Sequence, residues 1–145
     1  MIEVAAVVIR NPQGHVLTVR KKSSTKYQLP GGKPEAGEAL VDESAGVAHG
    51  VILMGGTTVG RGCEIGAGAR VDDSVIFDGV TIEPGAMVRN SIIAAGARIG
   101  ANARVTDCVI GEGAQIGARC ELQAGMRVWP GVAIPDSGVR FSPDA

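Results

Sequence analysis

The chain has 145 residues, a formal net charge of −1, 22 glycines and only 3% aromatic residues. This balance offers no basic face for nucleic acid, and no stretch is long and apolar enough for a membrane helix, so neither partner is expected. The N-terminal MIEVAAVVIR lacks the basic start of a secretory signal, and three cysteines without CxxC spacing are typical of buried, reduced thiols. We therefore expect a cytoplasmic protein.

The first part of the chain, residues 1–46, has a varied sequence. In chain order it predicts a strand at 4–10, a turn at NPQG and a second strand at 16–20, which together make a hairpin. A polar loop and the extended segment YQLPGG follow. Residues 38–45 (EALVDESA) then predict about two turns of helix, which glycine ends.

The second part, residues 47–136, is an internal repeat. From residue 59 onward, aliphatic residues recur at spacings of six, six and five, three times over, and then at spacings of six. Val47 and Leu53 extend the series backwards. Six residues suit one short strand and one tight turn, and three such units would close a triangular coil. The repeat therefore predicts a mainly β fold, a parallel β-helix of about five coils, with a tail at 137–145.

The unit also predicts which side chains face inward. The aliphatic residue points into the prism, and the residue four places later also faces inward near a corner, so it must be small. Cys63 and Cys120 occupy this place, and Cys108 is likewise predicted to be structural. The glycine that often follows the aliphatic residue is expected to permit the turn conformation. Four arginines are expected at solvated outward corners, with an anion site between stacked arginines as the alternative: Arg70, Arg98, Arg104 and Arg127.

Units such as IGAGAR, IGANAR and IGEGAQ resemble those of hexapeptide-repeat proteins, and this resemblance implies a left-handed β-helix. Many proteins of that group are acyltransferases with a histidine base, whereas relatives of the γ-class carbonic anhydrases need three histidines for zinc. The chain has only His15 and His49, which excludes a three-histidine zinc site. A histidine-dependent acyltransferase would need His49, which lies at the junction of the two parts.

Residues from about 55 to 145 resemble, more narrowly, the C-terminal β-helix of sugar-nucleotide pyrophosphorylases, and most of all that of mannose-1-phosphate guanylyltransferases. The resemblance rests on the tail RVWPGVAIPDSGVRFSPDA and on three repeated corners, DSVI from Asp73, NSII from Asn90 and DCVI from Asp107. In that family a preceding Rossmann-like domain with a GxGTRL-type loop transfers the nucleotide, and this sequence has no match to that loop. The resemblance thus implies a scaffold that serves packing and oligomer contacts.

The first part has a different resemblance. Residues 2–38 resemble the opening of a Nudix hydrolase, and the string LPGGK…GE matches the first half of the family's box through Gly32 and Glu38. In that box a loop and helix present several carboxylates to Mg²⁺, which activates water against a diphosphate. The second half of the box is missing: its Arg and Glu would fall at Gly46 and Val47, and its two consecutive glutamates do not appear.

The Nudix resemblance implies a small set of candidate site residues. Glu38, Asp42 and Glu43 are the catalytic candidates, and Glu38 with Asp42 would be the metal ligands, as i,i+4 neighbours on the helix. Gly31 and Gly32 are the candidates for a nucleotide-binding loop. The alternative is that this truncated α/β fragment caps the open N-terminal end of the β-helix, since solenoids need capped ends. The chain would then be a chimera of two families.

Two functions remain open on these grounds. The first is a non-catalytic structural or oligomerisation module without a cofactor; the second is a Mg²⁺-dependent Nudix-type hydrolase with residual or no activity. We expect self-association through a lateral face of the prism, and a C-terminal tail that folds over the last coil with Trp129 or Phe141 covering it. The lateral face is expected to contain the outward residues of the second and third positions: Ala67, Ala94, Ala95, Ala101, Ala118, Ala124 and Trp129.

Overall fold

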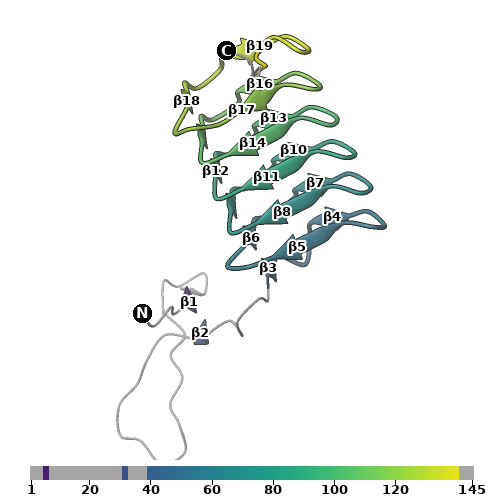
Figure 1. Ribbon diagram of the computed structural model, residues 1–145. Helices are drawn as coiled ribbons and strands as arrows, with labels where there is room; N and C mark the ends of the chain where they lie inside the picture. Colours follow the sequence, from purple (N-terminus) through teal and green to yellow (C-terminus); the bar gives the residue numbers. More distant parts are fainter. Residues whose placement is uncertain (1–4, 7–30, 33–38, 141–145) are drawn as a thin grey trace, which may run out of the picture. The chain divides into compact units, whose positions relative to one another are not determined.

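The computed structural model of the chain describes residues 5–6, 31–32 and 39–140 (Figure 1). The chain divides into two compact units, residues 1–35 and residues 36–145. In the first unit, strand β1 (Ala5–Ala6) pairs antiparallel with β2 (Gly31–Gly32). The rest of the expected Nudix-like fragment, including the second hairpin strand at 16–20, lies outside the described residues. Whether the fragment caps the β-helix is therefore not described either.

The second unit is a parallel β-helix. Each strand pairs in parallel with the strand one coil away, and three flat sheets make the sides of each triangular coil. We name them the β3 sheet (β18-β15-β12-β9-β6-β3), the β4 sheet (β19-β16-β13-β10-β7-β4) and the β5 sheet (β17-β14-β11-β8-β5). The strands are β3 Leu40–Val41, β4 Gly46–Val47, β5 Ile52–Met54, β6 Thr58–Val59, β7 Glu64–Ile65, β8 Arg70–Asp72, β9 Val75–Ile76, β10 Thr81–Ile82, β11 Met87–Arg89, β12 Ile92–Ile93, β13 Arg98–Ile99, β14 Arg104–Thr106, β15 Val109–Ile110, β16 Gln115–Ile116, β17 Glu121–Leu122, β18 Arg127–Val128 and β19 Ala133–Ile134.

The coils wind in the left-handed sense, which confirms the fold class expected from the repeat. Sheets of six, six and five strands give between five and six coils. The helix expected at 38–45 is wrong for the described part of that segment, where β3 and a turn precede β4. The coil prevails over local helix propensity because its backbone pairs with the next coil: the Leu40 N–H donates to the Thr57 carbonyl over 2.9 Å, and Asp42 N–H to Val59 over 2.9 Å.

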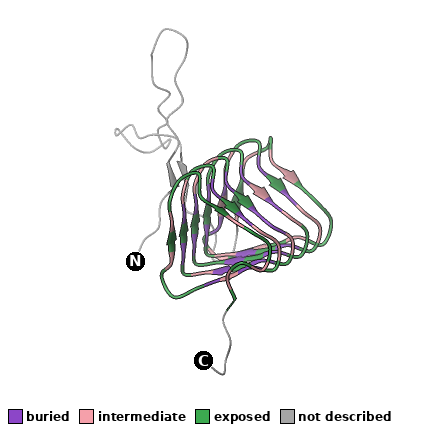
Figure 2. Cartoon of the chain, turned by 90° about the horizontal axis from the view of Figure 1, so that it is seen from above, coloured by how far each residue is buried: buried purple, intermediate pink, exposed green. Residues whose placement is uncertain are grey.

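The repeated aliphatic residues form ladders inside the prism. In the β4 sheet, Ile82 stacks on Ile99 and Ile99 on Ile116, in register, and all three are buried. Figure 2 shows the buried positions lining the inside of the coils. The inward register is therefore confirmed. Because stacked isoleucine and valine fill the interior, the fold needs few aromatic residues, and each fully buried side chain of this kind contributes about 1.5–3 kcal/mol.

The small inward position is confirmed as well. The alanines at this place, such as Ala97 and Ala103, are buried, and so are Cys63 and Cys120. Cys108 is also buried, and all three cysteines are free thiols. Burial raises the pKa of the Cys63 and Cys108 thiols, which keeps them protonated and unreactive and agrees with a structural role.

At the corners of the shortened, five-residue units, buried hydroxyl groups form a ladder of hydrogen bonds from coil to coil. Ser74 Oγ accepts the Ser91 N–H over 3.1 Å, and Ser91 Oγ accepts the Cys108 N–H over 3.1 Å. The residues just before them, such as Asp73 and Asn90, have positive φ (44° and 46°). The side-chain oxygens thus pair backbone groups that the missing sixth residue would leave without a partner, which explains the repeated D/N-S corners physically.

The turns lie one to two residues later than expected. They fall at the third and fourth positions of the unit, and positive φ occurs at the fourth, for example at Gly96 (66°) and Asn102 (56°). The second-position glycine has another purpose. A Cβ on Gly100 would lie 2.5 Å from the backbone nitrogen of Ala118, in the next coil. This glycine therefore permits close approach of successive coils, and the expectation that it shapes the turn is wrong.

The C-terminal tail continues the winding. The Glu121 N–H donates to the Val139 carbonyl over 2.8 Å, so the tail lies along the edge of β17. Trp129 was expected to cover the last coil, but it does not. It comes directly after β18 and its side chain is 78% exposed. Phe141 lies outside the described residues. No helix in the described part of the chain is long and apolar enough to cross a membrane.

Candidate functional site: the outer faces of the β-helix

The carboxylates expected to bind metal do not share a helix face. Asp42 and Glu43 lie at a turn between β3 and β4, and Glu38 lies outside the described residues. Asp42 Oδ1 accepts the Ser44 hydroxyl over 2.6 Å and the Ser44 N–H over 2.9 Å, and these bonds lower the pKa of the Asp42 carboxyl. Asp42 therefore serves the turn and does not stand on the expected helix, while the position of Glu38, its expected partner, lies outside the described residues.

The candidates for a nucleotide-binding loop, a metal site and an acyltransferase base gain no support from the described residues. Gly31 and Gly32, the candidates for a nucleotide loop, form the short strand β2, and nothing is described around them that bears on nucleotide binding. Among the described residues, no group of three or more histidine, cysteine, aspartate or glutamate side chains is placed to hold a metal ion. His49, the candidate acyltransferase base, lies in an exposed turn.

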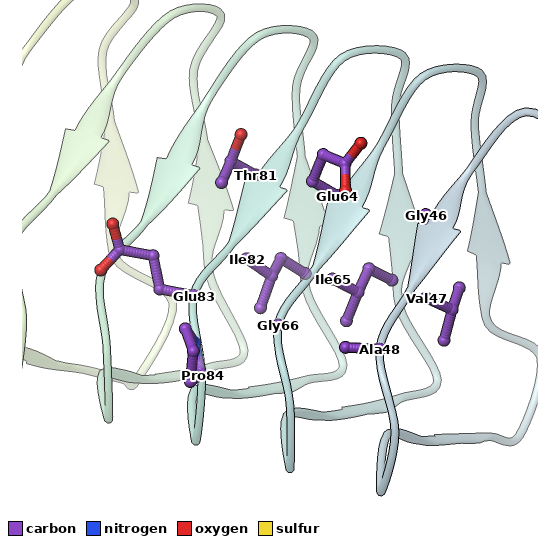
Figure 3. A pocket seen from close by; sticks show the side chains of 10 residues that line it. All are labelled: Gly46, Val47, Ala48, Glu64, Ile65, Gly66, Thr81, Ile82, Glu83 and Pro84. Carbon is purple, nitrogen blue, oxygen red and sulfur yellow. The ribbon is translucent and has the colours of Figure 1, made fainter.

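The outer side of the β4 sheet carries two open grooves. The first, of about 410 Å³, is bordered by Glu64, Thr81 and Glu83 (Figure 3). The Glu64 carboxylate lies over Gly46, and the backbone of Pro84 packs against Gly66. The groove's only charged side chains are the two carboxylates, Glu64 and Glu83, and no cation accompanies them in the groove lining. The lining of the groove has no nucleophile paired with a base, so it offers no catalytic arrangement of that kind.

The second groove of the β4 sheet, of about 530 Å³, contains an ion pair. Arg98 Nε donates to Glu83 Oε1 over 2.8 Å and the Arg98 guanidinium makes a second bond to the same oxygen. The other Glu83 oxygen accepts the Ala101 N–H over 2.8 Å. Glu83 thus joins two coils and neutralises Arg98, which leaves this groove little affinity for an anion.

The four arginines expected at corners stand on strands instead, directly before the inward aliphatic residue. They belong to three different sheets: Arg70 and Arg104 to the β5 sheet, Arg98 to the β4 sheet and Arg127 to the β3 sheet. Even the two on one sheet are separated by Met87. They are exposed, as expected for a solvated face, but no stack of arginines forms an anion site.

Charged residues at the turns bind neighbouring coils together. Asp78 Oδ1 accepts the Arg61 N–H over 2.9 Å, and Asp78 Oδ2 accepts the Arg61 guanidinium over 2.8 Å. These bonds lower the pKa of the Asp78 carboxyl and raise that of Arg61. Asp136 accepts the Ala118 N–H in the same manner over 2.8 Å. These carboxylates act on stability, since each one satisfies a turn N–H of the adjacent coil.

The β3 sheet differs from the other two because the middle of its outer side is apolar. Val75, Ile92 and Val109 stack in register on neighbouring strands and are 39%, 43% and 40% exposed. Phe77, two residues after Val75, is 49% exposed on the same face. We call these four residues the apolar stripe. Single exposed aliphatic residues are ordinary, whereas a continuous row of them is typical of an interaction surface.

The apolar stripe consists of other residues than the lateral contact face that was expected from the sequence. The alanines chosen there, such as Ala67 and Ala101, lie in turns, and Ala94 and Trp129 lie directly before turns. On a strand, side chains alternate, so the residue beside each inward aliphatic residue must face outward. The sequence holds this signal in the pairs Val75-Ile76, Ile92-Ile93 and Val109-Ile110, where two adjacent aliphatic residues cannot both face the core.

The comparisons with known proteins cover this second unit. The family model described as the GMPPB C-terminal domain matches residues 36–140. The mannose-1-phosphate guanylyltransferase of Mycobacterium tuberculosis is 67% identical over 108 residues, which are 74% of this chain and 30% of that protein. The chain thus spans less than a third of the length of the curated relative that it matches.

Solved structures are similar in fold alone. The acetyltransferase domain of PglB from Neisseria gonorrhoeae has a TM-score of 0.62 and 18% identity, over 72% of this chain and 54% of that one. The same domain in complex with acetyl coenzyme A has a TM-score of 0.60 and 17% identity, with the same coverage. The match over residues 36–140, together with the β-helix and its D/N-S corners, shows that this chain belongs to the GMPPB C-terminal domain family.

Proposed function

We propose that the β-helix is a non-catalytic structural and self-association module of a mannose-1-phosphate guanylyltransferase-like protein. The observation that carries the proposal is the apolar stripe, in which Val75, Ile92 and Val109 expose aliphatic surface in a continuous row across neighbouring coils. A rigid, flat sheet with short β-branched side chains loses little side-chain freedom when it is covered, which favours association.

The chemistry of the described residues agrees with this role. The charged pairs on the outer faces, Arg61 with Asp78 and Arg98 with Glu83, neutralise each other and join coils. The likeness to the acetyltransferase domain concerns the fold, and a general base of the kind used by such enzymes would have to be His49, in its exposed turn. No observation on the described residues favours the hydrolase alternative.

Sedimentation velocity over a wide range of concentration tests self-association. We expect the full chain to sediment above its monomer mass of 14.7 kDa as concentration rises. A species of 14.7 kDa at every concentration would contradict the proposal.

A turnover assay tests the absence of catalysis. With Mg²⁺ or Mn²⁺, we expect no hydrolysis of nucleoside triphosphates, ADP-ribose or sugar nucleotides above background. Turnover that the substitution Glu38→Gln abolishes would replace the proposal by the hydrolase alternative, because Glu38 is the residue that matches the Nudix box.

A further inference from the structure

The inference concerns the partner of the apolar stripe and its orientation, and it rests on the self-association proposed above. The outward residues of the β3 sheet read, from the first coil to the last, Leu40, Thr58, Val75, Ile92, Val109 and Arg127. The middle of this row is aliphatic and one end is cationic. A second row, two residues further along each strand, reads Asp42, Gly60, Phe77, Ala94, Gly111 and Trp129.

We propose that the β3 sheet binds the β3 sheet of a second copy across a two-fold axis that runs along the strands, between β9 and β12. Such an axis reverses the order of coils and keeps the direction of the strands. Each strand then meets the strand that is equally far from the centre, so β9 faces β12 of the second copy and β3 faces β18. The interface is isologous and closed, as in most homodimers.

The shapes of the facing side chains fit this arrangement. Val75 meets Ile92 of the second copy, which places aliphatic groups together at the centre. In the second row, the large Phe77 meets Ala94, a small residue that leaves room for the ring. Gly60 meets Gly111 in the same row. A protruding ring opposite a methyl group gives the interlocking contact that well-packed interfaces require.

The charges at the ends of the row also fit. Arg127 on β18 faces Leu40 of the second copy, and Asp42 lies two residues further along that chain, diagonally opposite Arg127. The long guanidinium side chain therefore reaches toward a carboxylate of the second copy, and a two-fold axis makes this contact twice. Opposite charges at these two ends favour this orientation.

The opposite arrangement, with both copies pointing the same way, places like groups together. A two-fold axis along the prism would set Arg127 against Arg127 of the second copy. Two guanidinium groups at that place repel each other. The reversed arrangement is therefore favoured.

The size of the face predicts a reversible dimer. Six strands at ~4.8 Å spacing make a face about 24 Å tall, and about four residues of each strand at ~3.3 Å contribute to its width. Two such faces bury roughly 600 Å² of flat area in total, which is below the ~1,000 Å² of stable specific interfaces and is typical of weak, transient ones. We therefore expect association that depends on concentration.

Substitutions that place a charge in the stripe test the face. In Val75→Glu, two carboxylates enter the interface without a partner, and we expect association to weaken about tenfold or more. Met87→Glu is the matched control, since Met87 is also 39% exposed and holds the equivalent outward place on the β5 sheet. Thermal unfolding of both variants checks that each is folded. Weakening by Met87→Glu with no effect of Val75→Glu would overturn the face but leave self-association intact, whereas a monomeric wild type would overturn both.

Mixing two variants tests the orientation. Ile92→Lys alone is also expected to weaken association, but mixed with Val75→Glu it restores a heterodimer, because residue 75 of one copy faces residue 92 of the other. A second measurement uses Thr58→Cys mixed with Val109→Cys and a short bis-maleimide, because β6 faces β15 of the second copy while two copies of residue 58 lie three strand spacings apart, about 14 Å; the native cysteines are buried. We expect the mixed dimer to cross-link more than either variant alone. Cross-linking of Val109→Cys with itself, and no rescue in the mixture of charged variants, would overturn the reversed orientation.

Discussion

The first coil and the middle coils of the β-helix carry the same pattern but bury it differently. Val47 and Ile99 hold the same inward place in the β4 sheet, yet Val47 is 43% exposed and Ile99 is 0% exposed. Strand β13 has a neighbour on each side, β10 and β16, whereas β4, among the strands that the structure describes, pairs with β7 alone. The sequence pattern thus sets the direction of a side chain, and neighbouring coils decide how far it is buried. Stability should therefore concentrate in the middle of the solenoid.

The largest effect is expected from Ile99→Ala. The substitution removes three carbons from a fully buried ladder that continues above and below, so a cavity remains. We expect the free energy of unfolding to fall by about 2–5 kcal/mol. Urea unfolding measures it, and a loss below ~0.5 kcal/mol would contradict the inward register.

A second, smaller effect is expected from Ser91→Ala. The hydroxyl accepts the buried Cys108 N–H over 3.1 Å and donates to the Arg89 carbonyl over 2.7 Å, so its removal leaves backbone groups without a partner. We expect a loss of about 1–3 kcal/mol. Ser44→Ala is the matched control in the first coil, where the Ser44 hydroxyl also accepts an N–H, that of Gly62, but in solvent. Equal losses for the two variants would contradict the role given to the ladder.

Val47→Ala should cost less than either. Its side chain loses little contact on truncation because almost half of it already faces solvent. We expect the free energy of unfolding to fall by less than about 1 kcal/mol. The same urea titration compares it with Ile99→Ala, and equal losses would mean that the first coil is as well covered as the middle.

The smallest effect concerns the pH dependence of the turn carboxylates. The Arg61 N–H and guanidinium lower the pKa of Asp78 below its ordinary value of 3.8. A lowered pKa in the folded state stabilises the fold above the unfolded pKa, and this contribution is lost as pH falls through the folded pKa. NMR titration of the Asp78 carboxyl should place its midpoint below that of Asp78 in the unfolded chain. Because the pair is exposed, Asp78→Asn should change the acid unfolding midpoint only slightly.

Much of the fold follows from the spacing of aliphatic residues. Ile82, Ile99 and Ile116 could be assigned to one inward ladder because their separation of 17 residues is one full coil. Strand β3 could not be found in this way. Its segment, EALVDESA, has good helix formers, and only pairing with the next coil makes it a strand.

The turn and the outer face were harder to predict because glycine serves two purposes in the unit. In IGAGAR it occurs at the second and the fourth positions, and composition does not tell close approach from positive φ. Asn102, in the related unit IGANAR, held the signal, since asparagine tolerates positive φ and marks the fourth position as the turn. Once the turn is placed there, Val75 and Ile92 must face outward, and the apolar stripe follows.

Side-chain footprinting by hydroxyl radicals tests the central proposal, self-association through the β3 sheet, most directly. Phe77 lies in the apolar stripe and Met87 on the β5 sheet, and both are large, reactive side chains that are half exposed in one chain. As concentration rises, we predict that the labelling of Phe77 falls while that of Met87 stays constant. Constant labelling of Phe77 at concentrations where the mass exceeds 14.7 kDa, or protection of Met87 instead, would contradict the account.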